Sequence, residues 1–270
     1  GLTLDELAEV ARELGLPPYG ARQLAGWLYR RHANSFEHMT DLPVRAREQL
    51  TGRFIVGGCP PREVRVSRDG TRKYLYSTSE RCVETAWIPD GRRSTLCIST
   101  QAGCRMRCRF CHTGRQPFRG HLEAAEILNQ YRSLPERDQV TNLVVMGMGE
   151  PLDNWSAVRR ALQVWTAPWG YAWSPRRITV STVGLLPALL ELVRETDIHV
   201  AISLHTPFAE ERAAWIPSER AHPIREVVNT LRSADVWGQR CLMFEYIVFS
   251  GLNDTARHVR GLARLLHGLP

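Results

Sequence analysis

The pattern of apolar residues in the first fifty positions predicts a small helical domain. Apolar side chains recur at three- and four-residue spacing from Leu4 to Leu14 and from Ala21 to Tyr29, which is the spacing of one helix face. The pair Pro17-Pro18 separates the two stretches, because proline removes a backbone donor and ends a helix. We therefore expect a helical accessory domain over residues 1–52.

Between about Arg62 and Ile88 the pattern changes to alternation, which is typical of strands with one buried face. The apolar positions lie on both sides of an expected turn at Asp69-Gly70: Val64, Val66, Tyr74, Tyr76 and Val83. We expect a few antiparallel strands here, so that residues 53–93 form a short β-rich segment connecting two larger parts of the chain.

Beyond Ser94, short apolar runs alternate with amphipathic stretches at spacings that suit βα units. The expected strands are Thr95–Ser99, Leu143–Met148, Ile178–Ser181, His199–Leu204 and Leu242–Phe249. The expected helices are Leu122–Leu134, Trp155–Trp165, Leu185–Glu195, Ile224–Ala234 and Asp254–Leu266. Five successive βα units over residues 94–270 predict an α/β fold, and a closing barrel would need at least one more strand.

The composition also indicates a basic surface that could bind a partner. The formal charge is +7, and Lys73 is the only lysine. Between Gly91 and Leu122 there is no carboxylate, but there are seven arginines: Arg92, Arg93, Arg105, Arg107, Arg109, Arg115 and Arg119. This cluster favours a phosphate-bearing partner, and a solvated loop surface is the alternative.

The chain has neither a long apolar window nor a signal-peptide pattern at its start, so we expect a cytoplasmic protein with no membrane segment. Its seven cysteines are an odd number, and three of them fall within eight residues. Such spacing is more typical of metal ligands or reactive thiols under reducing conditions than of a disulfide framework.

Those three cysteines follow the first strand of the βα region in the arrangement Cys104-x3-Cys108-x2-Cys111. In parallel α/β folds, the loops after the strands carry the active site. Three thiolates on one loop can bind three irons of a four-iron cluster and leave the fourth iron open to a chelating ligand. The alternative is a zinc site in which His112 completes a Cys3His tetrahedron.

The cysteine spacing, with Phe110 before the last cysteine, resembles the radical S-adenosylmethionine (AdoMet) superfamily. Further segments resemble, in order and spacing, the RlmN/Cfr family of RNA adenine methyltransferases: Phe36–Leu42, Ser94–Cys104, Val145–Leu152, Ser181–Gly184, Ala201–His205, Phe244–Tyr246 and Gly251–Asp254. The resemblance covers essentially the whole chain. It implies a partial (β/α)6 radical-AdoMet barrel with five βα units, and an RNA-binding role for the helical domain.

The same resemblance implies a [4Fe-4S] cluster on Cys104, Cys108 and Cys111, with AdoMet bound to its open iron. It also implies AdoMet contacts at the ends of the later strands, from Gly149, Glu150, Ser181, Ser203, Leu204 and His205. A glycine lets the backbone approach the cofactor, and a carboxylate can receive its ammonium group. Hydroxyl and imidazole groups can bond the ribose and adenine edges.

In the family, a cysteine near the C-terminus carries a methyl group that is transferred to the adenine, and a second cysteine releases the adduct by forming a disulfide. Cys97 stands at the position of this second cysteine, and Glu84 at that of the carboxylate that removes a proton. Cys97 would need thiolate character, which Arg92 and Arg93 could favour. The remaining cysteines match no position of the methyl carrier, so we expect a fragment of a longer protein.

The resemblance leans toward the RlmN type, which methylates C2 of an adenine in large-subunit rRNA and in some tRNAs. A Cfr-like enzyme that methylates C8 and a non-catalytic, zinc-stabilised RNA-binding module are the alternatives. His112 and Pro117 depart from the commonest family pattern after the cluster, which leaves substrate choice near that loop open. We further expect a monomer that receives electrons from a donor such as flavodoxin.

Overall fold

The computed structural model describes residues 1–78, 81–234, 238 and 240–269. The N-terminal part contains α1 (Leu4–Glu13), α2 (Gly20–Ala25), a π-helical turn η1 (Gly26–Arg30) and α3 (Val44–Arg53). Both helices expected from the spacing are present, and the second continues from α2 into η1. A capping box between Thr3 and Glu6 begins α1 and satisfies backbone donors that a helix start leaves free.

One sheet of eight strands crosses the described chain in the order β1-β2-β3-β4-β7-β8-β9-β10. The antiparallel strands expected before residue 93 are β1 (Glu63–Val66), β2 (Arg72–Thr78) and β3 (Arg81–Asp90). The strands that follow in the sheet are parallel to each other: β4 (Arg93–Cys97), β7 (Asn142–Val145), β8 (Ile178–Thr182), β9 (His199–Ser203) and β10 (Leu242–Glu245). The α/β prediction is confirmed in this mostly parallel sheet.

The helices that follow the parallel strands also match the expected ones: α5 (Ala124–Arg132), α6 (Trp155–Thr166), α7 (Leu186–Glu195), α9 (Ile224–Ser233) and α10 (Ala256–Leu266). The sequence did not predict two short helices, α4 (His112–Arg115) and α8 (Ala209–Trp215), or the small strand pair β5 (Gln101–Ala102) and β6 (Gly120–His121). Short 3₁₀ turns connect several elements: η2 (Arg137–Gln139), η3 (Pro151–Asn154), η4 (Pro175–Arg177) and η5 (Pro217–Arg220). Helix α8 has no apolar periodicity because its buried side chain is an arginine, Arg212.

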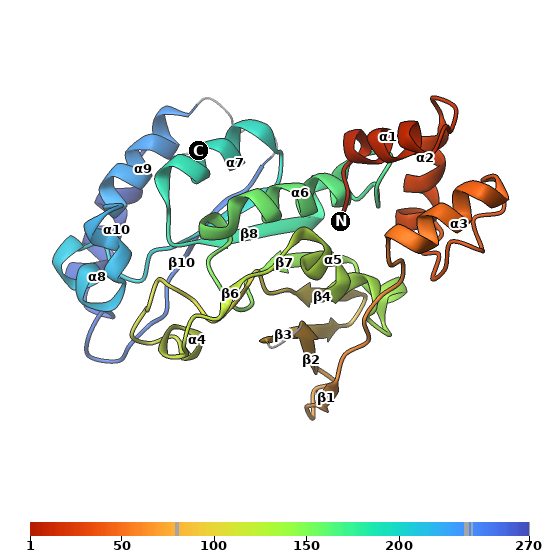
Figure 1. The fold of residues 1–270 in the computed structure, drawn as a ribbon. Helices are drawn as coiled ribbons and strands as arrows, with labels where there is room; N and C mark the ends of the chain where they lie inside the picture. The colour runs from red at the N-terminus through yellow and green to blue at the C-terminus, as the bar shows by residue number, and fades with distance from the viewer. Residues whose placement is uncertain (79–80, 235–237, 239, 270) are drawn as a thin grey trace.

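The two faces of the parallel sheet differ in chemistry. One face carries fully buried aliphatic side chains, including Leu96, Leu143, Val180 and Ile202, and burial of each stabilises the fold by about 2 kcal/mol. The other face carries Cys97, Ser181, Ser203 and Glu245, because side chains alternate along a strand and the register aligns these positions. Figure 1 shows the N-terminal helices α1–α3 at one end of the molecule and α8–α10 at the other.

An aromatic cluster attaches the N-terminal helices to the rest of the chain. The ring of Tyr29 lies 5.7 Å from that of Tyr171, which in turn lies 5.0 Å from Tyr131. Such pairs contribute about 1 kcal/mol each beyond burial. Arg132 of α5 donates to the carbonyl oxygens of Leu28 and Ala33, at 2.8 and 2.5 Å. The attachment is therefore a packed interface.

None of the described helices combines the length and the apolar composition needed to span a bilayer.

Candidate active site

The cysteine loop leaves β4 through β5 and folds back on itself. Gly103 has φ +82°, and a Cβ there would lie 2.4 Å from the carbonyl oxygen of Pro117, so only glycine fits this close crossing. Asp153 of η3 accepts two hydrogen bonds from Arg105, at 2.9 and 2.7 Å, which fixes the loop beside the end of β7. These contacts hold Cys104 at the carboxyl ends of the parallel strands.

The three thiols face one cavity of about 340 Å3 at the carboxyl ends of the parallel strands. Most residues predicted to form the site line this cavity: Cys104, Cys108, Cys111, Gly149, Glu150, Ser181, Ser203 and His205. Leu204 is fully buried outside the lining. The structure therefore brings together eight side chains or backbone positions that span about a hundred residues of sequence.

Glu150 is the carboxylate at the end of β7, and only 3 % of its surface is exposed. It accepts hydrogen bonds from the backbone N–H groups of Leu152 at 3.0 Å and Val183 at 2.9 Å. Burial raises its pKa to about 7, while its hydrogen bonds oppose that rise. Before it, Gly149 has φ +102°, and a Cβ there would lie 2.6 Å from the side chain of Gln101. A side chain at position 149 would displace Gln101.

Three adjacent strands contribute oxygen-bearing side chains that meet in the cavity. Ser181 of β8 and Ser203 of β9 donate to the same carboxylate oxygen of Glu245 on β10, at 2.6 and 3.1 Å. Sequence reasoning included Glu245 in a family motif but did not assign it to the site. Its place at the end of the fifth parallel strand was the available clue, because the same rule selected Ser181 and Ser203.

His205 closes the cavity beside Phe110, whose ring centroid lies 4.9 Å from the imidazole. Its backbone is in the left-handed region at φ +60°, where the amide of Asn253 bonds its carbonyl oxygen at 2.7 Å. Burial, followed by the positive charge of Arg212, lowers the pKa of His205 to about 4. The neutral ring accepts from the N–H of Ile247 at Nδ1, so Nε2 carries the proton.

Cys97 and Glu84 do not line the cavity, although both were predicted to be catalytic. Burial raises the pKa of the Cys97 thiol to about 11, and the nearby charge of Glu245 adds to the rise. The expected thiolate character from Arg92 and Arg93 is therefore not found, since both arginines are exposed at the opposite end of β4.

The Glu84 side chain is about half exposed and forms an ion pair with Lys73 at 2.9 Å. Residues 84 and 86 alternate to the same face of β3, and Ala86 pairs with Cys97 in the register. Glu84 and Cys97 therefore lie on one sheet face, outside the cavity.

The donor set of the cavity fits an iron–sulfur cluster. Burial raises the pKa of the Cys104 thiol to about 11 and that of Cys108 to about 12, so both thiols are protonated near neutral pH unless a cation binds them. In a four-iron cluster each thiolate binds a different iron, and the sulfurs need not converge on one point. A zinc tetrahedron needs that convergence. Among the described residues, no three Cys, His, Asp or Glu side chains converge in this way, and His112 is absent from the cavity lining.

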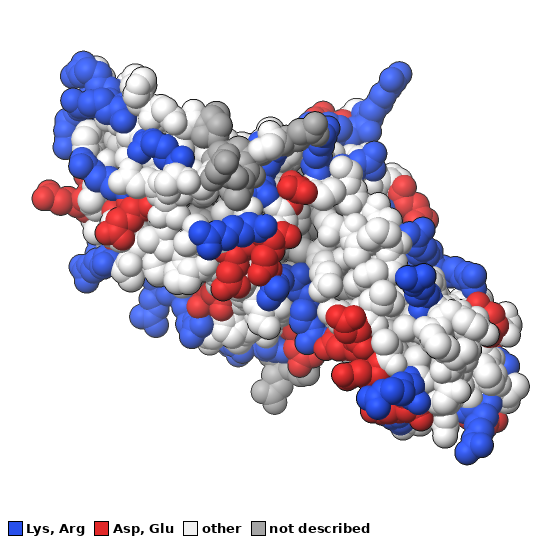
Figure 2. Space-filling view, turned by 90° about the horizontal axis from the view of Figure 1, so that it is seen from above, with Lys and Arg blue, Asp and Glu red and all other residues white. Residues whose placement is uncertain are grey.

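The charge around the cavity differs from that on the helix-covered face. Five exposed arginines lie on the cysteine loop, Arg105, Arg107, Arg109, Arg115 and Arg119, whereas the exposed Arg92 and Arg93 lie at the opposite end of β4. On the face seen in Figure 2, basic and acidic side chains are intermingled across the middle of the molecule. Ion pairs such as Arg159–Glu195, at 2.6 Å, link neighbouring helices α6 and α7. Asp153 balances the charge of Arg105, and the other four arginines give the cysteine loop the positive charge that a polyanion would contact.

Two family models match the chain. Residues 98–265 match the radical SAM superfamily, whose name refers to AdoMet. Residues 1–56 match the N-terminal domain of ribosomal RNA large subunit methyltransferases. The first match contains the cysteine loop and all the strand ends that line the cavity, and membership of that superfamily implies AdoMet and a [4Fe-4S] cluster as cofactors.

Relatives and a solved structure agree with these matches. The chain is 48 % identical to a probable dual-specificity RNA methyltransferase RlmN from Parabacteroides distasonis, over all of this chain and 79 % of the relative. It is 41 % identical to the dual-specificity RNA methyltransferase RlmN of Geobacter sulfurreducens, over all of this chain and 75 % of that protein. A radical SAM methyltransferase from Sphaerobacter thermophilus superimposes with a TM-score of 0.89 and 36 % identity, covering 99 % of this chain and 81 % of the other. The chain belongs to the RlmN family of radical AdoMet RNA methyltransferases.

Proposed function

We propose that this chain is part of an enzyme that methylates C2 of an adenine in large-subunit rRNA and in tRNA, and that the methyl-carrying cysteine of that enzyme is not among these residues. The observation that carries the proposal is the cavity in which three thiols of one loop face hydroxyl and carboxylate groups of the strand ends. The exposed arginines around the cysteine loop supply the charge that an RNA backbone needs. The two RlmN relatives are named as RNA methyltransferases of dual specificity.

Each side chain of the cavity has a proposed task. Cys104, Cys108 and Cys111 hold the cluster, which supplies the electron that cleaves the AdoMet sulfonium. Glu150 would receive the ammonium group of AdoMet, since a carboxylate can accept more hydrogen bonds than the two it receives from the backbone. The neighbouring Gly149 would present only backbone to the cofactor, and its lack of a side chain makes room for Gln101.

The hydroxyl-bearing end of the cavity is suited to the nucleoside part of AdoMet. Ser181 and Ser203 share the carboxylate of Glu245, and these three groups can exchange hydrogen bonds with ribose hydroxyls. His205, with its proton on Nε2, offers a donor to the adenine or ribose edge. Leu204 contributes backbone and apolar surface behind these groups.

Cys97 and Glu84 are proposed to act on the RNA adduct after methyl transfer. Both project from the sheet face that continues from the cavity, so a base bound over this face would lie between them. Glu84 would remove the proton from the adduct. The Cys97 thiolate would then form a disulfide with the methyl-carrying cysteine and break its C–S bond to the RNA, and the released carbon would keep the electron pair and take up a proton to become the methyl group. Cys97 forms no disulfide in the structure, and a free thiol is the form in which it would enter this step.

No other described cysteine is near the cavity, so the methyl-carrying thiol has no candidate here. Cys59 and Cys82 are exposed outside the lining, and Cys241 precedes β10, at the end of the strand away from Glu245. We expect these 270 residues to bind a cluster and AdoMet and to leave RNA unmethylated. Incubation of this chain with rRNA, AdoMet and a reductant tests this point. The appearance of methyladenosine would contradict the two-cysteine scheme.

Deletion of the gene tests the function itself. Loss of 2-methyladenosine from 23S rRNA and tRNA, measured by mass spectrometry of nucleosides, is the expected result, and restoration of the gene should return it. Loss of 8-methyladenosine instead would identify a Cfr-like enzyme. Unchanged nucleosides in both RNAs would reject the proposed reaction.

A further inference from the structure

Arg212 is a fully buried arginine in α8 that lies outside the cavity lining. A buried guanidinium is costly unless its donors are satisfied. Its Nη2 donates to the carbonyl oxygens of Val183 at 2.9 Å and Ser203 at 2.8 Å, and its Nε donates to that of Leu204 at 3.3 Å. One side chain thus binds the backbone just beyond or at the ends of two neighbouring parallel strands, β8 and β9.

The charge of Arg212 is balanced by Glu219 in η5, which is also buried. The carboxylate bonds Nη1 of Arg212 and accepts from the N–H of Ile224, at 3.1 and 3.0 Å from its two oxygens. The ion pair therefore satisfies its own members and joins α8 to the start of α9. Because Glu219 bonds only Nη1, the Nη2 and Nε groups of Arg212 can donate to the carbonyl oxygens at the strand ends.

The peptides that Arg212 binds also bind the cavity residues. Val183 accepts from Arg212 at its carbonyl oxygen and donates its N–H to the carboxylate of Glu150, at 2.9 Å. Ser203 accepts from Arg212 at its carbonyl oxygen and donates its hydroxyl to Glu245. A single residue therefore links the guanidinium to each of the two carboxylates that line the cavity: Val183 links it to Glu150, and Ser203 links it to Glu245.

Helix α8 also contacts the cysteine loop. The N–H of Arg109 donates to the carbonyl oxygen of Trp215, the last residue of α8, at 2.9 Å. Cys108, Val183 and Ile216, which all line the cavity, pack together as one buried apolar group. The helix that carries Arg212 thus joins the loop for the cluster to the strands for the rest of the ligand.

We propose that Arg212 is a positioning residue for AdoMet, which fixes from behind the cavity wall the strand ends that present Glu150 and Ser203 to the cofactor. The inference rests on the proposed function, because it assumes that AdoMet occupies this cavity. Lysine cannot replace the arginine: the planar guanidinium reaches three carbonyl oxygens and a carboxylate at once, whereas an ammonium is a compact point charge.

The test uses the 270-residue chain, reconstituted without oxygen, and the variant Arg212→Lys. AdoMet affinity is measured by equilibrium dialysis and by the change that AdoMet causes in the electron paramagnetic resonance spectrum of the reduced cluster. We expect Arg212→Lys to keep its iron content and to bind AdoMet about 10-fold more weakly or worse, since at least one charged hydrogen bond is lost. The matched control is Arg72→Lys, which alters an ion pair with the buried Glu136 outside the cavity.

The outcomes separate this inference from the proposed function. A wild-type chain that binds no cluster or no AdoMet rejects the proposed function. A wild-type chain that binds both, with equal affinity in Arg212→Lys, overturns the positioning role alone. If Arg212→Lys does not fold, the double variant Arg212→Gln/Glu219→Gln decides, because it removes the guanidinium contacts with the strand ends and leaves no buried unpaired charge. AdoMet affinity at least 10-fold weaker with unchanged iron content supports the role, and affinity within about twofold of wild type overturns it.

Discussion

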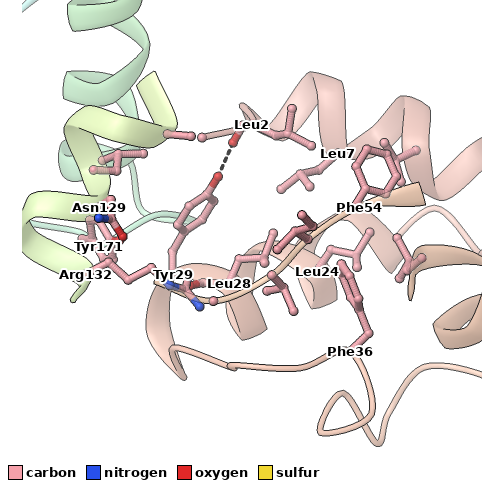
Figure 3. A pocket seen from close by; sticks show the side chains of 18 residues that line it. Leu2, Leu7, Leu24, Leu28, Tyr29, Phe36, Phe54, Asn129, Arg132 and Tyr171 are labelled. Carbon is pink, nitrogen blue, oxygen red and sulfur yellow. Dashed lines mark hydrogen bonds between the residues drawn. The ribbon is translucent and has the colours of Figure 1, made fainter. Parts of the chain in front are cut away.

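Two cavities in the described part of the molecule have similar volumes but different polar groups in their linings. The cysteine-bearing cavity has a volume of about 340 Å3, and a second cavity of about 310 Å3 lies between the N-terminal helices and α5. Figure 3 shows Leu7, Leu24, Phe36 and Phe54 lining this second cavity from the helical side. Tyr29 donates its hydroxyl to the carbonyl oxygen of Leu2, as the dashed line in Figure 3 marks.

Polar groups are used differently in the two cavities. In the apolar cavity, Asn129 exchanges two hydrogen bonds with the backbone of Cys59, and Arg132 bonds two carbonyl oxygens. In the cysteine cavity, thiols, hydroxyls and a shared carboxylate meet around the space, and Gly149 and His205 hold left-handed backbone conformations. Volume therefore says little about function here, and the chemistry of the lining separates a binding site from a packing defect.

The largest expected effect is loss of the cluster from the cysteine cavity. Replacement of Cys108 by serine removes one of three iron ligands, so we expect iron content and the brown absorbance after anaerobic reconstitution to fall to near zero. Cys59→Ser, which changes an exposed thiol beside the apolar cavity, should keep both. A brown Cys108→Ser protein with full iron content would show that Cys108 is not needed for the cluster and would contradict the assignment of the cysteine cavity as the cluster site.

A smaller effect is expected from the carboxylate shared by the two serines. Glu245→Gln keeps the size of the side chain and weakens both hydrogen bonds, so AdoMet affinity should fall about tenfold, equivalent to about 1.4 kcal/mol, while iron content stays constant. Titration of AdoMet by equilibrium dialysis measures the change. The exposed Glu63→Gln on β1 is the control, and equal affinities in the two variants would exclude Glu245 from the site.

A substitution in the second cavity is expected to lower the stability of the fold without weakening the binding of the cluster or AdoMet. Leu24 is 1 % exposed, and Leu24→Ala should destabilise the fold by about 3 kcal/mol because it enlarges an existing void. Ile55→Ala changes a fully exposed residue of the same lining and should cost less than about 0.5 kcal/mol. Urea unfolding measures stability. A loss of AdoMet binding in folded Leu24→Ala would show that this cavity has a functional role.

The smallest effect concerns two histidines, His205 in the cysteine cavity and His32 in the N-terminal part of the chain. Burial lowers the pKa of both His205 and His32 to about 4, and two arginines near His32 add to its shift. Their stabilising contribution is present above the unfolded pKa of about 6.5 and is lost as the pH falls from there toward 4.

His32→Gln should therefore lose less stability between pH 7 and pH 5 than wild type, by about 2–4 °C in melting temperature. His38→Gln, which changes an exposed histidine, should follow the wild-type curve. Thermal scans at the two pH values compare the variants. An equal fall in melting temperature between pH 7 and pH 5 in all three proteins would mean that protonation of His32 does not affect stability in this range.

The sequence by itself determined the local elements and the chemistry of the cysteine loop. The expected strands and helices of the βα region are present because each depends on the periodicity of its own residues. The spacing of Cys104, Cys108 and Cys111 predicts a three-ligand site because the ligands are neighbours in the chain. Family motifs then identified the strand ends, most of which line the cavity.

Only the tertiary structure decided which distant groups meet. The hydroxyl of Ser181 reaches Glu245 across 64 positions of sequence, a contact set by strand order and register. Helix α8 has no apolar periodicity, because its buried residue is an arginine whose partners are carbonyl oxygens of other elements. Hydrogen bonds between remote segments leave no periodic pattern in a single chain, so the sequence supplied the ligands and the fold determined how they are held.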